Sequence, residues 1–463
     1  MAEIVVIGAG PAGLMAALRS AQSGHRCTVV EATEAVGGMA GSFEVAGQRV
    51  DYGSHRLHPA TPERFLQLFR SRLGPDLQVR PRMGRIRLHG RWIAFPLRAG
   101  DMVRSLPPSF GARVALDAAT APLRRRRSAG TTTFADEVAH RLGPSVAREF
   151  YAPYARKLYG VEADQLDREL ARRRVSATGA GDVLRRVMRA ARPQGRSFLY
   201  PRQGYGQLSE ALADLAVDLG VDLRLGTRVL GLRPAGAAVS VRLDGGVLDA
   251  GAVLTTMPAP ALAAAVDPPP PAAVVEALDR CRTRAVVLAY LVVGRDRCTP
   301  YDAHYFPGPE TVVSRLSEPK NYRDGDDPPG RTVLCAEIPC WPGDELWQRS
   351  EDRIGELVAE DMARSGLQIP ELERVEVRRL PAVYPVYETA SMGARATVEQ
   401  WLRSLVPARI LSLGRHGLGV LDNLHHVLAM GEAAAVALGP DGTVDPVAWH
   451  QSLDGFASHV VED

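Results

Sequence analysis

The chain has 463 residues, of which 46% are hydrophobic and 24% are charged. This composition is typical of a globular protein rather than a disordered one, and the length allows two hydrophobic cores. The 56 basic and 53 acidic residues leave a net charge of only +3, so we expect no nucleic-acid partner.

Local patterns exclude further classes of protein. No apolar stretch reaches the ~18 residues that a membrane-spanning helix needs, so we expect no transmembrane segment. The first apolar run begins at Ile4 without a basic leader or a cleavage site, which argues against a signal peptide. Five cysteines without CxxC spacing argue against zinc, iron–sulfur clusters and a disulfide framework, and predict a cytoplasmic protein. The one dense basic run, residues 124–127, is interpreted as a solvated surface rather than a membrane or nucleic-acid contact.

The N-terminal residues contain a pattern typical of dinucleotide-binding sites. The apolar residues 4–7 predict a short buried parallel strand, which leads into the sequence GAGPAG and then into helical spacing over 14–23. In such a turn Gly8 lets the chain reverse sharply, Gly10 lets the backbone approach a pyrophosphate, and Gly13 lets the helix pack closely on the strand. The helix N-terminus then points free N–H groups at the phosphates.

A second predicted strand, residues 27–30, ends in Glu31, eighteen residues after Gly13. A carboxylate at this place can accept hydrogen bonds from both hydroxyls of an adenosine ribose. The pattern predicts a dinucleotide site and leaves both NAD and FAD open.

The residues that follow favour FAD. The segment EATEAVGGMAG, residues 31–41, resembles the glutathione-reductase-like flavoproteins, in particular the branch of amine oxidases, protoporphyrinogen oxidases, carotenoid desaturases and UDP-galactopyranose mutases. In that branch an acidic residue and a glycine pair wrap the FAD diphosphate and ribityl chain. Met39 stands where an Arg or Lys often follows the glycine pair, so a phosphate contact there would come from the backbone. No Cys or His is marked out as a covalent link, so we expect noncovalent FAD.

Two later parts of the chain resemble the rest of this FAD-binding domain. Extended residues 226–229, a strand over 238–243, a turn at 244–246 and a strand over 252–257 predict a small meander and a return strand to the main sheet. By the resemblance, the backbone at Val229 contacts the adenine. A last strand over 409–413 and a helix over 424–438 complete the domain.

We therefore predict an α/β fold in which a Rossmann-like FAD-binding domain carries an inserted α+β substrate domain. The FAD-binding domain is predicted to comprise residues 1–95, 196–275 and 401–463. The substrate domain is predicted to comprise 96–195, which is helical and rich in arginine, and 276–400, which has strands such as 285–291.

Two segments resemble parts of the branch that lie against the isoalloxazine ring. The DYGSHR loop at 51–56 resembles a loop that crosses close to the flavin, so that His55 and Arg56 would face the ring or the substrate. The alternative is that Asp51 and Arg56 only fix the loop. The second segment, 414–426, resembles a turn and helix whose N-terminus points at the pyrimidine edge, where Arg415 would stabilise negative charge on reduced flavin.

Two neighbouring histidines and one lysine need separate interpretations. His425 and His426 are adjacent on the predicted helix and point about 100° apart, so joint metal ligation is not expected. Lys320 is one of only two lysines, and lies in a segment, 314–322, that resembles a loop of the substrate domain. In amine-oxidase-like enzymes a lysine near flavin N5 often holds a water that assists reaction with dioxygen, so we hypothesise this place for Lys320. The alternative is an ordinary surface lysine.

These inferences give a leading hypothesis for function. We expect an FAD-dependent oxidoreductase that removes hydride from a C–N or C–C bond of a small organic molecule. A redox-neutral enzyme like UDP-galactopyranose mutase, acting on a sugar nucleotide, is the alternative, although Val420 and Leu421 stand where the mutases carry aromatic residues. An idle flavin-fold binding protein is a third possibility. The expected catalytic residues are His55, Arg56, Arg315, Lys320 and His416. The expected cofactor-binding residues are Gly8, Gly10, Ala12, Gly13, Glu31, Gly38, Met39, Gly53, Ser54, His55, Val229, Arg415, Asp422 and Asn423, with no metal.

Overall fold

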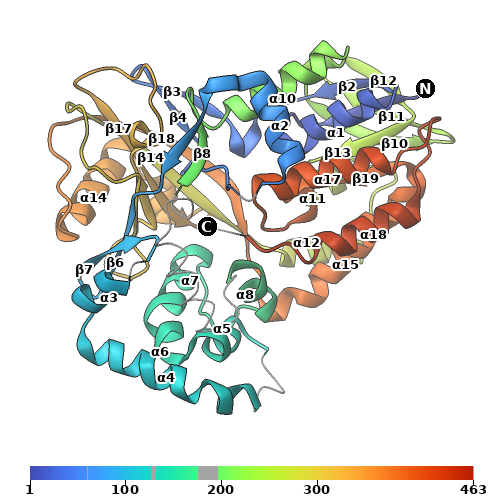
Figure 1. Ribbon diagram of the computed structural model, residues 1–463. Coiled ribbons are helices and arrows are strands. Elements are labelled where there is room, and N and C mark those ends of the chain that lie inside the picture. Colours follow the sequence, from blue (N-terminus) through green and yellow to red (C-terminus); the bar gives the residue numbers. More distant parts are fainter. Residues whose placement is uncertain (60, 98, 127–131, 176–196, 462–463) are drawn as a thin grey trace.

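A parallel five-stranded sheet, in the order β19-β13-β1-β2-β9, joins segments from widely separated parts of the chain. The computed structural model of the protein describes residues 1–463 except 60, 98, 127–131, 176–196 and 462–463 (Figure 1). Four of the five residues of β1 are fully buried or nearly so, as expected for a parallel sheet that is covered on both faces. The strands are β1 (Glu3–Ile7), β2 (Arg26–Val30), β9 (Asp222–Arg224), β13 (Ala252–Thr255) and β19 (Ile410–Ser412).

Alternating side chains of β1 divide the N-terminal part into two cores. Ile4 and Val6 point to a face covered by three helices, whereas Val5 and Ile7 point to the face covered by the antiparallel meander. The predicted strand, glycine turn, helix, meander and return strand are confirmed. The helices are α1 (Pro11–Gln22), α10 (Gln207–Asp218) and α17 (Leu424–Val436), and the meander strands are β10 (Val229–Ala235), β11 (Ala238–Leu243) and β12 (Gly246–Ala250).

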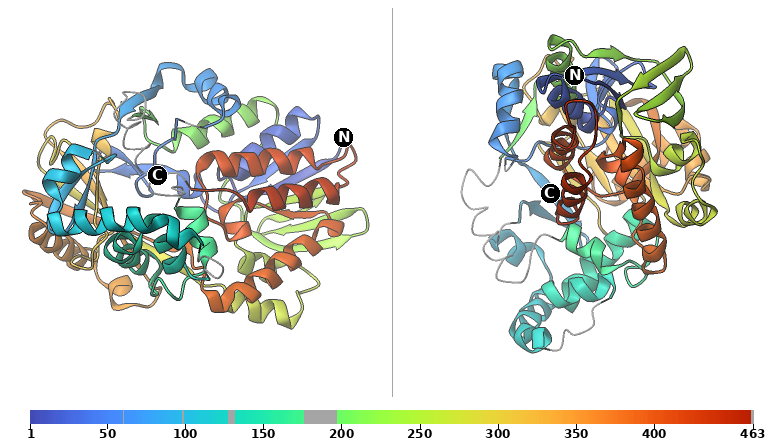
Figure 2. Two further views of the ribbon diagram at one scale, coloured as in Figure 1. Left: turned by 60° about the horizontal axis from the view of Figure 1, so that its bottom comes forward. Right: turned by 90° about the vertical axis from the view of Figure 1, so that its right-hand side faces the viewer.

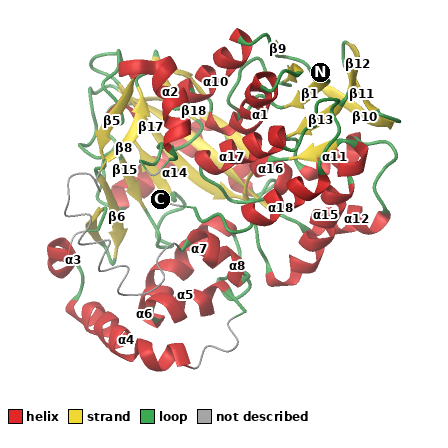
Figure 3. Cartoon of the chain, turned by 45° about the vertical axis from the view of Figure 1, so that its right-hand side comes forward, coloured by secondary structure: helices red, strands yellow, loops and turns green. Residues whose placement is uncertain are grey.

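A second, mixed sheet of seven strands lies beside the first (Figures 1 and 3). Its neighbouring strands are antiparallel except for β15 and β6, which pair in parallel. In sheet order the strands are β18 (Leu372–Pro385), β14 (Thr283–Val293), β17 (Thr332–Cys340), β16 (Arg315–Ser317), β15 (Ala303–Tyr305), β6 (Gly84–Leu88) and β7 (Arg91–Phe95).

Strand pairing bears on the domain boundaries. β6 and β7 lie within residues 1–95, the first segment of the predicted FAD-binding domain, but they belong to the second sheet through the pairing of β6 with β15. We therefore propose that the first boundary lies before Gly84. The helix α15 (Met392–Ser404) packs against α12 (Ala272–Arg280) in the core that includes Val5, so we propose that the last boundary lies before Met392. Residues 98, 127–131 and 176–195 of the first predicted insert lie outside the described residues.

Of the other helices, α14 packs on one face of the second sheet, and those from α4 to α8 form a separate layer at one end of the molecule (Figure 2). Within the described residues, no helix is both long and apolar enough to cross a membrane. These helices are α2 (Glu63–Leu73), α3 (Ala99–Ser105), α4 (Pro108–Arg126), α5 (Phe134–Leu142), α6 (Pro144–Val146), α7 (Ala152–Tyr159), α8 (Arg168–Arg174), α11 (Ala259–Ala265), α13 (Glu345–Gln348), α14 (Glu351–Arg364), α16 (Gly414–Leu418) and α18 (Pro446–Phe456). Two small antiparallel pairs, β3 (Ser42–Val45) with β4 (Gln48–Asp51) and β5 (Leu77–Pro81) with β8 (Ser197–Pro201), complete the fold.

Close packing of α17 on α1 generates a prediction about Gly431. A Cβ atom at this position would lie 2.3 Å from the backbone oxygen of Ala12, so the two helices would have to separate. We expect Gly431→Ala to destabilise the protein by about 1–3 kcal/mol, measured as a lower thermal midpoint. Gly111 of α4 is the control, because nothing lies within 4 Å of its Cβ position, and Gly111→Ala should leave stability unchanged or raise it slightly. Equal midpoints for both variants would contradict the packing argument.

Candidate functional site

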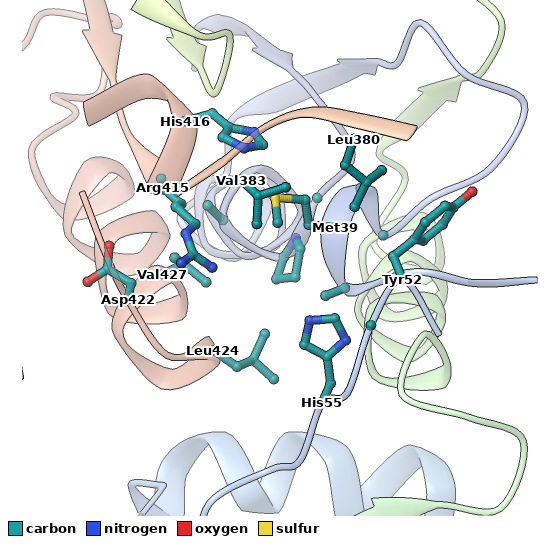
Figure 4. Close-up of a pocket in the computed structure, with 18 of the residues that line it drawn as sticks. Met39, Tyr52, His55, Leu380, Val383, Arg415, His416, Asp422, Leu424 and Val427 are labelled. Atoms are coloured by element: carbon teal, nitrogen blue, oxygen red, sulfur yellow. The ribbon is translucent and has the colours of Figure 1, made fainter. Parts of the chain in front are cut away.

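One cavity of about 940 Å³ runs from the glycine turn after β1 to the middle of the second sheet. Its lining includes the carboxyl ends of β1 and β2, the loop after β4, the start of α16 and strands β14, β17 and β18 (Figure 4). Ligand sites of parallel α/β sheets lie at the same carboxyl edge. The topology therefore places the predicted dinucleotide residues and the second sheet around a common space.

The glycine turn has the shape that a diphosphate needs. Gly8 has a positive φ of 100°, which favours glycine, and a Cβ at Gly13 would lie 2.0 Å from the carbonyl oxygen of Gly8. A Cβ at Gly10 would meet only the carbonyl oxygen of Gly37, at 4.0 Å. Gly10 thus leaves open the space beside the N-terminus of α1, while Gly13 serves the packing of helix on strand and does not line the cavity.

The carboxylate of Glu31 is held at the end of β2. Its Oε2 accepts a hydrogen bond from the backbone N–H of Ala9 at 2.8 Å. Its Oε1 accepts from the backbone N–H of Thr33 at 2.9 Å and from the Thr33 hydroxyl at 2.8 Å. The side chain is therefore positioned before a ligand arrives, and it lines the cavity.

The glycine pair forms a tight turn against the first glycine turn. Gly37 and Gly38 both have positive φ, 112° and 52°, and the N–H of Gly37 donates to the carbonyl of Ala9 at 2.8 Å. The following side chain, Met39, points into the cavity (Figure 4). No cation replaces the usual Arg or Lys at this turn, so the backbone supplies its polar groups.

Asp51 anchors the loop that leaves β4. Its carboxylate accepts hydrogen bonds from the Ser42 hydroxyl at 2.6 Å, the Tyr200 hydroxyl at 2.5 Å and the Tyr205 N–H at 2.9 Å. Burial raises the pKa of Asp51, and these donors act against the increase. Asp51 is thus a structural residue, as one of the two interpretations of the loop expected.

Arg56 from the same loop both fixes structure and faces the cavity. Its guanidinium pairs with Asp302 at 3.0 Å and donates to the Tyr305 hydroxyl at 3.2 Å and the Tyr322 hydroxyl at 3.3 Å. The Asp302 carboxylate is only 1% exposed. Arg56 therefore carries its own counter-ion into the cavity wall.

Glu337 on β17 joins the loop after β4 to the second sheet. Its Oε1 accepts from the backbone N–H of Ser54 at 2.8 Å, and its two oxygens accept from Nε and a terminal nitrogen of Arg315, each at 2.8 Å. A Cβ at Gly53 would lie 3.3 Å from the same Oε1. The predicted residues Gly53, Ser54 and Arg315 are thus brought together by a carboxylate that the sequence did not single out.

His55 is a neutral side chain among cations. Its ring stacks on Tyr205 at a centroid distance of 5.1 Å and an angle of 21°. Burial, and then the charges of Arg315, Arg415 and Arg56, lower the pKa of His55 to about 3. The imidazole therefore carries no charge at neutral pH.

Arg415 lies near the N-terminus of α17, and its side chain points into the cavity (Figure 4). Burial lowers the pKa of Arg415. Its Nε is buried, and among the described residues no ion pair or hydrogen bond holds the guanidinium. Asn423 occupies the N-cap position of α17, where its N–H donates to Nδ1 of His426 at 3.2 Å. A buried cation and a helix N-terminus thus face the same end of the cavity.

The remaining predicted residues differ in position. His416 lines the cavity, and its Nε2 lies 2.9 Å from the carbonyl oxygen of Ala382. Lys320 does not line the cavity, so its hypothesised place near the flavin gains no support from the structure. Its Nζ donates hydrogen bonds to the carboxylate of Asp296 at 2.7 Å and to the carbonyl oxygens of Pro328 and Arg331 at 2.8 and 3.0 Å. These three acceptors hold the ammonium in place. The other predicted cofactor residues that line the cavity are Ala12, Gly38, Val229 and Asp422.

The C-terminal tail forms part of the wall. Val461 lines the cavity, and its N–H donates to the carbonyl of Arg173 at 2.7 Å. Nδ1 of His459 lies 3.2 Å from Asp422, and the His459 ring stacks on His426 at 4.1 Å and 14°. Asp422, His426 and His459 form the one group of potential metal ligands within the described residues. The lone pair of an imidazole nitrogen lies in the plane of its ring, and two stacked ring planes do not meet at one ion, so we interpret the group as packing.

Sequence reasoning missed several lining residues, among them Arg82, Tyr305 and Val461. Arg82 gave no signal because arginine is the default cation of this chain. Tyr305 and Val461 reach the cavity only through the pairing of β15 and the path of the tail. No local pattern predicts either arrangement.

Comparisons with known proteins agree with this geometry. The family model described as flavin containing amine oxidoreductase matches residues 11–411. A Mycobacterium tuberculosis protein provisionally named flavin-containing monoamine oxidase AofH is 30% identical over 281 residues, which cover 58% of this chain and 60% of that protein. The match thus spans about three fifths of the relative's length.

Solved structures show the same fold. Reduced UDP-galactopyranose mutase superposes with a TM-score of 0.78 at 19% identity over 100% of both chains. Putrescine oxidase bound to putrescine superposes with a TM-score of 0.62 at 16% identity over 94% of this chain and 98% of that one. Since the family model covers most of the chain, the protein belongs to the family of flavin-containing amine oxidoreductases.

Proposed function

We propose that the protein is an FAD-dependent oxidoreductase that removes a hydride from a C–N or C–C bond of a small organic molecule. The observation that carries this proposal is the cavity of about 940 Å³. It is lined at one end by the glycine turn and Glu31, and at the other by the rings of Phe198, Tyr305 and Tyr384. A cofactor and a substrate would therefore meet in one common space.

The residues of the first end fit FAD. Gly8, Gly10 and Gly38 would hold the diphosphate, Glu31 the ribose and the backbone at Val229 the adenine. Bound FAD would supply a hydride acceptor at N5 of its isoalloxazine ring. Arg415 and the N-terminus of α17 would then stabilise negative charge on the ring.

At the second end we propose roles for groups without a net charge. Nδ1 of His55 is buried without a partner among the described residues, so it is available for a hydrogen bond inside the cavity. Because the imidazole is neutral, it would orient a bound molecule rather than neutralise a charge. Arg56 and Arg315, each held by a carboxylate, would orient polar groups of the substrate.

A redox-neutral reaction on a sugar nucleotide is the second candidate. It is supported by the superposition on UDP-galactopyranose mutase over the whole chain, a likeness of fold. It lacks support at Val420 and Leu421, where the mutases carry aromatic residues. We therefore favour oxidation.

Anaerobic mixing distinguishes the candidates. The holoenzyme is mixed with a panel of primary amines, amino acids and cyclic carboxylic acids, and the flavin absorbance is followed. In an oxidoreductase the flavin loses its absorbance when the substrate reduces it, and the absorbance returns when an electron acceptor is added. Conversion of UDP-galactopyranose only after chemical reduction of the flavin would support the mutase-like alternative instead, and neither response would indicate a binding protein.

Glu31→Ala should weaken FAD binding by about 1.5–3 kcal/mol, because the charged acceptor of two ribose hydroxyls is lost. Titration calorimetry of the apoprotein with FAD measures the change. Glu34→Ala is the control, because Glu34 is an exposed acid of the same loop and does not line the cavity. Unchanged affinity in Glu31→Ala would show that the ribose is held elsewhere.

Arg415→Ala should lower the reduction potential of the bound flavin and slow its reduction, while FAD stays bound. The expected loss is about 1.5–3 kcal/mol of stabilisation of the reduced form, as for one charged hydrogen bond. A redox titration against a reference dye measures it. Arg415→Lys keeps the charge, so its reduction potential should fall between those of the unaltered protein and of Arg415→Ala. An unaltered potential in the alanine variant would place the guanidinium away from the ring.

A further inference from the structure

Two guanidinium groups of the cavity lie against Tyr305, and a third lies one aromatic ring farther away. Arg56 donates to the Tyr305 hydroxyl, and the Arg315 guanidinium lies 5.9 Å from the centre of the Tyr305 ring. The Arg82 guanidinium lies 4.5 Å from the centre of the Phe95 ring, which in turn contacts Tyr305 at a centroid distance of 5.3 Å. All three arginines and Tyr305 line the same cavity.

Only two of these arginines have a counter-ion. Asp302 pairs with Arg56, and Glu337 pairs with Arg315 through two hydrogen bonds. In the part of the chain that the structure describes, Arg82 has neither an ion pair nor a hydrogen bond, and its Nε is buried without a partner. Of these three arginines, Arg82 is thus the one whose positive charge has no compensating partner among the described residues.

An unpaired, partly buried cation is unfavourable for the protein unless a ligand compensates it. A guanidinium offers several N–H donors in a planar fork, which fits a carboxylate or a phosphate. The electrostatic potential at His55 is positive, since Arg56, Arg315 and Arg415 all disfavour the protonated form of its side chain. A substrate ammonium in this space would meet the same repulsion.

Part of the cavity wall is apolar. Leu380 and Val383 point into the cavity beside Met39 (Figure 4), and Val286 and Leu288 of β14 line it as well. A bound molecule would therefore bury a ring or chain against these side chains and place its charged group at the arginines.

We propose that the cavity takes an organic anion, an apolar ring or chain that carries a carboxylate or a phosphate, with the anionic group bound by Arg82 beside Arg56. This inference rests on the proposed function only for the reaction; binding itself requires no turnover. It sets the substrate apart from the positively charged amines that the family name suggests.

Three probes with the same ring and different charged groups test the proposal: phenylacetate, phenyl phosphate and 2-phenylethylamine. Each is titrated into the oxidised holoenzyme at constant ionic strength, and the perturbation of the visible flavin spectrum is recorded. We expect saturable perturbation by at least one anion, at a concentration about tenfold or more below any effect of the amine. The stronger anion distinguishes carboxylate from phosphate.

The matched variants are Arg82→Gln and Arg91→Gln. Arg82→Gln should weaken binding of the anion about tenfold or more, because one charged hydrogen bond is lost. Arg91 is an exposed arginine at the start of β7, outside the cavity, so Arg91→Gln should bind as the unaltered protein does. FAD affinity and the thermal midpoint show that each variant is folded.

Three results would overturn the proposal: no saturable perturbation by either anion, flavin reduction or tighter binding with the amine, or unchanged anion affinity in Arg82→Gln. Failure of the proposed function has a different signature. Anions would then bind in an Arg82-dependent manner, but no compound of the anaerobic panel would bleach the flavin.

Discussion

The carboxylate of Glu337 joins the loop after β4 to the second sheet in the wall of the cavity. Ser54, which donates its backbone N–H to this carboxylate, belongs to the loop after β4, whereas Arg315 and Glu337 belong to neighbouring strands of the second sheet. The Glu337 side chain is only 5% exposed, and its charge is compensated by one guanidinium. Removing either partner from a buried pair leaves an uncompensated charge, which costs about 3–5 kcal/mol. The loop and the second sheet are thus held together by a contact that tolerates little change.

The sequence predicted the part of the molecule that is governed by local rules. Gly8, Gly10 and Gly13 are separated by fixed intervals because a strand, a tight turn and a helix must follow one another. Their roles could therefore be assigned before any tertiary contact was known. The same holds for the meander and for the helix that begins after Asn423, where turn residues and an N-cap mark the limits.

Long-range pairing set the limit of prediction. The rarity of lysine in this chain suggested a functional place for Lys320, but its ammonium donates hydrogen bonds to one carboxylate and two backbone carbonyl groups. Arg82 looked ordinary among 56 basic residues that include only two lysines. It became informative only once the pairing of β6 with β15 had placed its neighbourhood beside Tyr305. Whether a cation has a partner is a property of tertiary structure, and composition carries no trace of it.

The path of the tail has a practical consequence for work with this protein. The N-terminus lies at the outer end of β1, the central strand of the parallel sheet, whereas the C-terminal tail lies near the middle of the molecule (Figures 1 and 3). Val461 is itself part of the cavity wall, and the stack of His459 on His426 leads the tail there. An affinity tag attached after Val461 would begin beside the substrate space, while a tag before Glu3 would begin far from it. Recombinant protein for kinetic or ligand-binding work is therefore better purified through its N-terminal end.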